Sequence, residues 1–238
     1  MLHCAFEQHF GYHGSCEDLI EGYLEVIGPQ GNLLMPSMPY RTSALDYLSN
    51  LKSFDVRKTP SAMGLVSEFF RRRPNVLRSA NPTHPILACG PKAEWFVEGH
   101  ENCEFGCGPG SVFDKLLQVG GKVAFFNLPF AYFTFFHYLE HRVRPMLRFN
   151  LYREPAFDVN VVNRLGRCIV VKSHAFSIDA MRRRRFAVLE RWLLDRRAIK
   201  KVRLGASYFL LVELTQVVGI VDEMARHGDF FYDMSAAN

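Results

Sequence analysis

Three residues of the segment 134–140 carry side chains that could act together in a reaction. Thr134, His137 and Glu140 recur at i, i+3 and i+6, a spacing that places them near one face of a helix. An imidazole can take a proton from an attacking nucleophile, a carboxylate can orient the imidazole, and a hydroxyl can donate to a developing oxyanion. These are the groups that acyl transfer to an amine needs. From spacing alone, a structural pair of a partly buried histidine and a glutamate one turn away is the simpler interpretation.

The same segment matches a pattern of a different chemistry. Residues 137–141 read H-Y-L-E-H, the H-x-x-E-H pattern of inverted zinc peptidases. In that alternative His137 and His141 would bind Zn²⁺, Glu140 would be the base, and a distant acid such as Glu213 would be the third ligand. A pattern of five residues arises easily by chance, and the surrounding sequence favours a reaction without a metal.

Cysteine chemistry is a third alternative. Cys103 and Cys107 border a glycine-containing loop that could present a thiol, but nothing in the sequence marks either thiol as activated. Two cysteines without a second pair also make a weak metal site. The glycines of residues 106–110 form no phosphate-binding fingerprint, because no strand leads through them into a helix. We therefore expect reduced cysteines of the loops or the core.

Helices and short apolar strands alternate along the chain, and together they must position these residues. Apolar periodicity and capping signals predict helices over residues 18–27, 60–73, 92–97, 111–117, 179–197 and 211–226. Short apolar runs predict strands over residues 33–35, 86–89 and 122–126, and residues 157–172 resemble a hairpin at the sheet's edge. The alternation predicts an α/β fold, a three-layer α/β/α sandwich with a central mixed, largely parallel sheet, in one domain over 1–238.

The strand 122–126 directs attention to the residues that follow it. Functional sites of α/β proteins lie beyond the carboxyl ends of strands, so the loop 127–130 and the helix after it are the natural location. We therefore expect Phe130 to contact the substrate.

Composition and charge narrow the class of protein. The chain is 48% hydrophobic with 13% aromatic residues, enough for a sizeable core, and it has neither a long apolar span nor a leader-like start. We expect a cytoplasmic protein that binds neither membrane nor nucleic acid. Residues 1–140 hold 11 Lys/Arg against 14 Asp/Glu, whereas residues 141–238 hold 18 against 10. By charge alone the basic second part suits nucleic acid, membrane headgroups or a phosphorylated small ligand equally. The run Arg182–Arg185 reads most simply as the solvated start of a helix.

Several segments, taken in order, resemble the aminoglycoside 3-N-acetyltransferase family of antibiotic acetyltransferases. The resemblance is carried by IGPQGNLLMP at 27–36, FD with TPSAMG at 54–64, RRRPNVLRS at 71–79, NPTHP at 81–85, FG leading to GS at 105–111, and Thr134, His137 and Glu140. It implies an α/β/α acyltransferase that uses acetyl-coenzyme A as cosubstrate, needs no metal, and acts on a small-molecule amine. The sequence leaves the oligomeric state open, a homodimer included.

The resemblance also implies site residues. His137 corresponds to the family's general base, Glu140 to the carboxylate that orients it and Thr134 to the hydroxyl near the thioester, while Asp55 and His84 correspond to residues of the acceptor cleft. The stretch that meets coenzyme A corresponds here to His3, Cys4, Ala5 and Phe6, and the TPSAMG segment contributes Ser61 and Met63.

Departures from the family pattern define the expectations for the ligands. Cys4 and Ala5 replace two serines of the coenzyme A stretch, and the chain starts at that stretch, so we expect a shortened N-terminus and weakened coenzyme binding. Aminoglycosides are polycations, and the basic second part favours an anionic amino sugar as acceptor. The alternative without catalysis is a degenerate family member that serves as a binding or assembly module.

Overall fold

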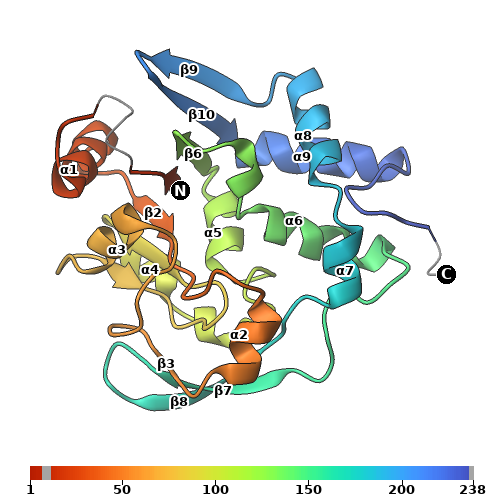
Figure 1. Ribbon diagram of the computed structural model, residues 1–238, viewed down its shortest axis with the longest axis horizontal. Coiled ribbons are helices and arrows are strands. Elements are labelled where there is room, and N and C mark those ends of the chain that lie inside the picture. Colours follow the sequence, from red (N-terminus) through yellow and green to blue (C-terminus); the bar gives the residue numbers. More distant parts are fainter. Residues whose placement is uncertain (7–11, 236–238) are drawn as a thin grey trace.

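The computed structural model describes residues 1–6 and 12–235, which form helices around three small sheets (Figure 1). The first sheet has the strand order β1-β6-β10-β9, with bounds Leu2–Cys4, Lys122–Phe126, Ser207–Glu213 and Lys200–Leu204. Strand β1 runs parallel to β6, so that His3 lies opposite Phe125, and β10 lies antiparallel on the other side of β6. The N-terminus is therefore held beside the strand that leads to residues 134–140.

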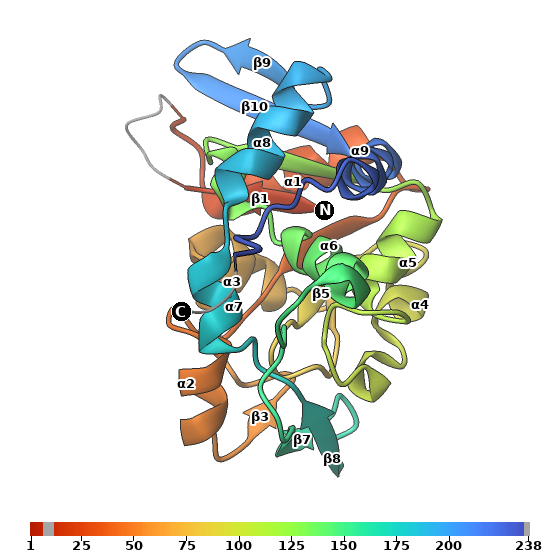
Figure 2. The ribbon, with the colours of Figure 1, turned by 90° about the vertical axis from the view of Figure 1, so that its right-hand side faces the viewer.

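The other two sheets lie below the first in Figure 1. The second sheet has the order β2-β5-β4, with bounds Leu33–Pro36, Ile86–Cys89 and Leu77–Arg78, and all of its pairings are antiparallel. The third has the order β3-β7-β8, with bounds Phe54–Asp55, Phe157–Val162 and Cys168–Ser173. Figures 1 and 2 both place the hairpin β7–β8 at the end of the molecule opposite β9 and β10.

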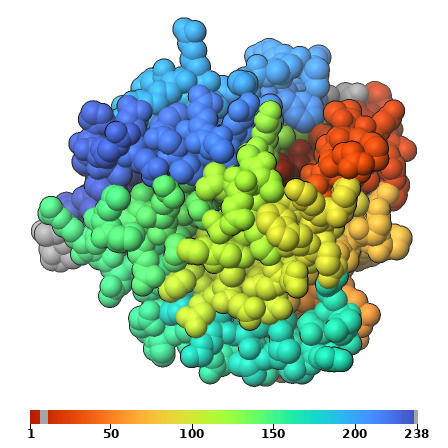
Figure 3. Space-filling model, turned by 180° about the vertical axis from the view of Figure 1, so that it is seen from behind, coloured from red at the N-terminus to blue at the C-terminus, as the bar shows by residue number. Residues whose placement is uncertain are grey.

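The helices pack around these sheets. Their bounds are α1 Cys16–Ile27, α2 Ala44–Asn50, α3 Leu65–Arg71, α4 Ala93–Val97, α5 Val112–Gln118, α6 Phe136–Val143, α7 Ile178–Arg183, α8 Phe186–Asp195 and α9 Leu214–Arg226. The space-filling view in Figure 3 shows α1 (red) and the C-terminal elements (blue) on the same half of the molecule, with β7–β8 (blue-green) along the opposite edge. Of the residues described, none form a helix long and apolar enough to cross a membrane.

The α/β class is confirmed, but the strand pairing differs from the expected largely parallel sheet. Within the described residues, only β1 with β6 and β3 with β7 pair in parallel, and the other pairings are antiparallel. A short apolar run identifies a buried strand without indicating its direction, so the sequence could not distinguish the two arrangements. The expectation of one domain over 1–238 stays a prediction.

Most predicted elements are present, and their ends follow from local capping. Helix α1 begins with a capping box, in which Ser15 and Asp18 exchange side-chain and backbone hydrogen bonds, and α5 begins with Ser111 as its cap. The predicted hairpin is present as β7 and β8, although it pairs with β3 in a separate sheet. Helix α5 therefore begins at its predicted cap, whereas α1, expected from residue 18, begins two residues earlier.

Three predicted helix boundaries are wrong. The helix expected from residue 60 begins only at Leu65, because residues 60–64 form a loop tied to Met38 through the Ala62 amide. The helix expected over 179–197 is broken between α7 and α8. The segment before residue 214, expected to be helical, is strand β10, which pairs with both β6 and β9.

The largest apolar cluster surrounds α6. Side chains from β6, α5, α6, α8 and α9 form it, including the fully buried Phe125, Phe135, Leu139, Leu193 and Val217. Burial of such side chains stabilises the fold by about 1.5–3 kcal/mol each. The helix that carries His137 is therefore fixed by the core on one side, and its polar residues have defined positions.

Candidate functional site

Helix α6 brings His137 and Glu140 into contact. The two residues are one turn apart on this helix, and Nδ1 of His137 lies 2.7 Å from Oε2 of Glu140. A carboxylate only accepts hydrogen bonds, so Nδ1 carries the proton and Nε2 is the basic atom of the neutral ring. Among the described residues Nε2 has no hydrogen-bond partner, and the His137 side chain is 24% exposed. The arrangement leaves a basic nitrogen available to a ligand.

Glu140 is completely buried, and every side of its carboxylate is occupied. Arg184 approaches with two nitrogens, Nε at Oε1 and Nη2 at 3.0 Å from Oε2, and the hydroxyl of Tyr232 donates to Oε1. Burial alone would raise the pKa of Glu140, but the hydrogen bond from His137 and the charge of Arg184 outweigh it and lower the pKa. Glu140 is therefore an ionised carboxylate that can stabilise a protonated His137.

A break between two helices places Arg184 at the site. Helix α7 ends at Arg183, Arg184 has an extended backbone that bridges to Tyr232, and α8 starts at Phe186. The Arg184 guanidinium then lies over the ring of Phe176, 4.6 Å from its centre, and reaches Glu140. The interpretation of 182–185 as a solvated helix start is thus wrong for Arg184, whose charge is used inside the protein.

Thr134 does not share a helical face with His137 and Glu140, as the i, i+3, i+6 spacing suggested. It precedes α6, and its carbonyl accepts the amide hydrogen of His137. Its hydroxyl lies 3.2 Å from Nε2 of His3 on strand β1. The expected shared helical face is therefore wrong: His137 contacts Glu140 on α6, while Thr134, before the helix, contacts His3 of the N-terminal strand.

A cavity of about 730 Å³ opens beside Thr134. It is lined by the start of the chain, the loop before α3 and the loop after β6; its lining residues include Leu2, His3, Cys4, Ala5, Phe6, Arg41, Ala62, Met63, Gly64, Leu128, Tyr132 and Thr134. Of the six residues expected to meet coenzyme A, five line this cavity. Ser61 lies behind it, because its hydroxyl contacts Ser67 at 2.9 Å and accepts the amide hydrogen of Met63.

His3 is a neutral side chain of this cavity. It stacks on Phe125 with ring centres 5.0 Å apart, and burial lowers its pKa to about 3. The backbone register of β1 against β6 sets its position. A neutral imidazole can donate through Nε2 to Thr134, whose own hydroxyl donates to the sulfur of Met1, a weak acceptor, at 3.7 Å.

His84 packs against His137, as expected for a residue near the site. The two ring centres are 5.2 Å apart, and burial lowers the pKa of His84 well below its usual range, so the ring is neutral. Oδ1 of Asn81 accepts hydrogen bonds from the amides of Thr83 and His84 and from the Thr83 hydroxyl, which fixes this turn. Gly106, at φ +68°, approaches the same turn so closely that a Cβ there would lie 2.8 Å from Nδ1 of His84.

Two residues expected in the acceptor cleft have other surroundings. Oδ1 of Asp55 accepts the backbone amides of Arg57 and Lys58, a local turn after β3. Phe130 is 1% exposed and packs against Phe125 in the largest apolar cluster. The loop position suggested a surface role for Phe130, but the short helical turn 130–132 directs the ring into the core.

The zinc alternative is not supported by the geometry. Glu140, the base in that alternative, is enclosed by His137, Arg184 and Tyr232, and Glu213, its third ligand, pairs with Lys200 at the end of β10. The part of the chain that the structure describes contains no group of three His, Cys, Asp or Glu side chains that could hold a metal ion.

The cysteines of the loop 103–107 are not activated nucleophiles. Burial raises the pKa of Cys103 to about 11 and raises the pKa of the fully buried Cys107 further. Both thiols donate to backbone carbonyls, Cys107 to that of Phe105. This result agrees with their interpretation as loop or core cysteines.

Part of the basic excess of residues 141–238 is paired with carboxylates. Many of its arginines pair with carboxylates: Arg142 with Asp222, Arg164 with Glu94, Arg183 with Asp179, Arg184 with Glu140, Arg185 with Asp233 and Arg196 with Glu223. Net charge already subtracts the carboxylates within this part, so only Arg164 and Arg184, which pair with Glu94 and Glu140 of residues 1–140, reduce its excess. The anionic amino sugar as acceptor stays a prediction.

Comparison with known proteins identifies the family. The family model of aminoglycoside 3-N-acetyltransferase matches residues 1–226. Aminoglycoside N(3)-acetyltransferase III of a Salmonella species is 25% identical over 152 residues, 59% of this chain and 53% of that relative. Aminoglycoside N(3)-acetyltransferase IV of a Salmonella species is 35% identical over 99 residues, 41% of this chain and 34% of that relative. The matched segment thus spans about half of the first relative, and less of the second.

Solved structures share the fold. AAC-IIIb in a binary complex with CoASH has a TM-score of 0.75 at 21% identity, covering 99% of this chain and 91% of that one. Sisomicin-bound AAC-VIa has a TM-score of 0.74 at 20% identity, covering 96% and 92%. With the family match over nearly the whole chain, the protein belongs to the aminoglycoside 3-N-acetyltransferase family.

Proposed function

We propose that this protein transfers the acetyl group of acetyl-coenzyme A to an amine of an amino sugar, with His137 as general base. The observation that carries the proposal is the His137–Glu140 pair, in which a buried, ionised carboxylate orients the ring and leaves Nε2 free of partners among the described residues. A relative of similar fold is complexed with CoASH and another with sisomicin, an aminoglycoside, which supports both substrates.

The cavity beside Thr134 fits the acyl donor. Its volume of about 730 Å³ lies within the range of small-molecule sites, and its lining is mostly apolar, with Arg41 as a charged side chain for a phosphate. Acetyl-coenzyme A, when bound, supplies the thioester. Cys4 and Ala5 line the cavity where the family has serines, so backbone groups and packing must replace those hydroxyls.

In the proposed reaction, Nε2 of His137 takes the proton as the amine nitrogen bonds to the thioester carbon. Glu140 stabilises the protonated ring, and Thr134 donates its hydroxyl to the developing oxyanion. The carbon–sulfur bond then breaks, and the proton on His137 is available to the departing thiolate. Each step uses a side chain already held in position, and no covalent bond to the enzyme forms.

The test is the replacement His137→Ala, read out as thiol release with acetyl-coenzyme A and a panel of amines. We expect turnover to fall by roughly two or more orders of magnitude, the usual contribution of a general base. His227→Ala is the control, because His227 is exposed at the end of α9. Unchanged turnover in His137→Ala would refute the role of His137.

The panel should compare aminoglycosides with nucleotide-linked amino sugars, since the two differ in charge. Calorimetric titration with acetyl-coenzyme A separates an enzyme from a binding or assembly module. If acetyl-coenzyme A does not bind at millimolar concentration, the result supports a binding or assembly module. If it binds but no amine of the panel causes thiol release, the result supports the acyl donor site and refutes transfer to these acceptors.

A further inference from the structure

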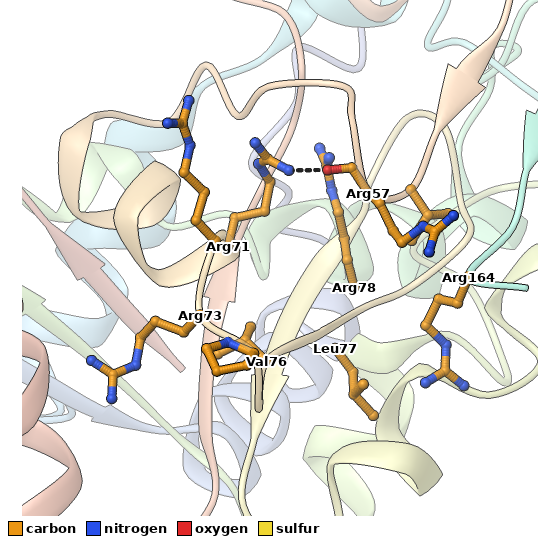
Figure 4. A pocket seen from close by; sticks show the side chains of 10 residues that line it. Arg57, Arg71, Arg73, Val76, Leu77, Arg78 and Arg164 are labelled. Carbon is orange, nitrogen blue, oxygen red and sulfur yellow. Dashed lines mark hydrogen bonds between the residues drawn. The ribbon is translucent and has the colours of Figure 1, made fainter. Parts of the chain in front are cut away.

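A second cavity, lined by arginines, lies on another side of α3. Its volume is about 480 Å³, and it is bordered by the end of α3, strand β4, the loop after β3 and the turn of the hairpin β7–β8. The arginines that line it are Arg57, Arg71, Arg72, Arg73, Arg78 and Arg164. Figure 4 labels Arg57, Arg71, Arg73, Arg78 and Arg164, whose side chains come from separate segments of the chain. Like charges repel, so such a grouping needs compensation.

Carboxylates compensate only part of this charge. Glu68 pairs with Arg71 and Arg72, Glu17 and Glu21 pair with Arg73, and Glu94 pairs with Arg164; these pairs account for four of the six arginines. Among residues 1–6 and 12–235, no carboxylate forms an ion pair with Arg57 or Arg78. The cavity therefore has positive charge in excess of its partners.

Arg78 makes this excess costly. Arg78 is 4% exposed, and its two terminal nitrogens donate to the carbonyls of Thr59 and Ser37 rather than to a carboxylate. Within the described residues its Nε has no hydrogen-bond partner. A buried cation is costly unless an anion is near, and burial lowers the pKa of Arg78 to about 9. An anion in the cavity would relieve this cost.

The two exposed walls of the cavity approach each other. A Cβ added at Gly166, in the turn of β7–β8, would lie 3.9 Å from Nη2 of Arg57, so this guanidinium extends toward the hairpin turn. Arg164 of the same turn lines the cavity as well. Two guanidinium groups from different segments can thus face one ligand, a geometry suited to tetrahedral oxyanions.

We propose that this arginine-lined cavity binds the phosphate group of a small molecule, separately from the cavity that includes Thr134. Helix α3 lies between the two: residues 64–67 at its start line the cavity beside Thr134, and residues 71–73 at its end line the arginine cavity. The proposal does not depend on acyl transfer, because its binding partner is recognised by charge and shape alone.

The experiment is a calorimetric titration of the full chain with inorganic phosphate and, separately, with AMP, at low ionic strength in a phosphate-free buffer. The test variant is Arg57→Ala with Arg164→Ala; Arg57 is exposed, Arg164 is partly exposed and Glu94 remains solvated, so folding should survive. Loss of charge-assisted hydrogen bonds predicts a Kd raised by about tenfold or more. The matched control is Arg191→Ala with Arg203→Ala, which removes the same charge outside the cavity.

Each outcome decides the proposal. Equal Kd values in the test and control variants would overturn it, as would absence of binding to the natural chain. Saturating coenzyme A should leave phosphate binding unchanged, and displacement of phosphate would refute a separate site. Tighter binding of AMP than of phosphate would identify a nucleotide as the ligand, whereas equal affinities would identify the phosphate group alone.

Discussion

Tyr232 donates its hydroxyl to Oε1 of Glu140, a residue 92 positions earlier in the chain. The same oxygen accepts Nε of Arg184, and the other carboxylate oxygen contacts His137. The orientation of His137 by Glu140 thus depends on residues from two distant segments of the chain. The first predictions concern this dependence.

Replacement of Arg184 by alanine should destabilise the fold. It leaves the fully buried Glu140 with one charged partner fewer, and breaking a buried ion pair costs about 3–5 kcal/mol. Unfolding in urea measures the loss. Arg182→Ala is the control, because Arg182 is an exposed arginine of α7; equal stability of the two variants would show that Arg184 does not support Glu140.

Replacement of Tyr232 by phenylalanine should have a smaller effect. The ring stays buried and only the hydroxyl is lost, which removes one hydrogen bond to a charged acceptor, about 1.5–3 kcal/mol. Because Glu140 then holds His137 less firmly, turnover should fall while KM for acetyl-coenzyme A stays constant. A change confined to KM would contradict this positioning role.

Replacement of Gly106 by alanine should disturb the turn that carries His84. The new Cβ would lie within 3 Å of His84 and Thr83, and the positive φ adds backbone strain, so we expect a loss of about 1–3 kcal/mol and of activity. Gly205→Ala separates the two effects, since Gly205 has φ +61° but no neighbour within 4 Å. Equal losses in both variants would assign the whole effect to backbone strain.

Substitution of Met63 by tryptophan should narrow the cavity beside Thr134. We expect KM for acetyl-coenzyme A to rise about tenfold with little change in stability, because the side chain faces open space. Met146→Trp is the control, at an exposed position outside that cavity. Unchanged KM in Met63→Trp would place the acyl donor elsewhere.

Stability should fall as the pH decreases from about 6.5 toward 4. Burial lowers the pKa of His3 to about 3, of His100 to about 4 and of His84 well below 6.5. The unfolded chain binds protons near pH 6.5, where these buried rings do not, so each histidine weakens folding by roughly 1.4 kcal/mol per pH unit over this interval. Urea unfolding between pH 8 and 5 measures the slope. A flat profile would show that the rings are not held neutral.

The sequence predicted the α/β class and much of the fold, because capping residues and apolar runs are local signals. Ser111 begins its helix as expected, the helix predicted over 18–27 is present with Ser15 as its cap, and the hairpin 157–172 forms. Strand direction was not predictable, since Leu33–Pro36 reads the same in a parallel or an antiparallel sheet. Strand β10 also resembled a helix, because its burial on β6 overrides its local pattern.

The site was predictable only in part. The spacing of His137 and Glu140 correctly indicated a contact, since both lie on one helix. The helical spacing did not predict the position of Thr134 correctly, because α6 starts after this residue. Arg184 was visible only as part of a run of arginines, and Tyr232 gave no signal, because both reach Glu140 through tertiary contacts that no local pattern encodes.

The break between α7 and α8 has a consequence for the order in which the protein matures during synthesis. A ribosome releases Glu140 long before Arg184 and Tyr232, so the nascent chain contains a carboxylate destined for the interior without the groups that neutralise it. Until residue 232 has emerged, packing of α6 would bury the charge of Glu140 without all of its partners, so the hydrated state of this segment is favoured. Formation of the complete hydrogen-bonded environment of Glu140 is thereby tied to the translation of nearly all of the described chain.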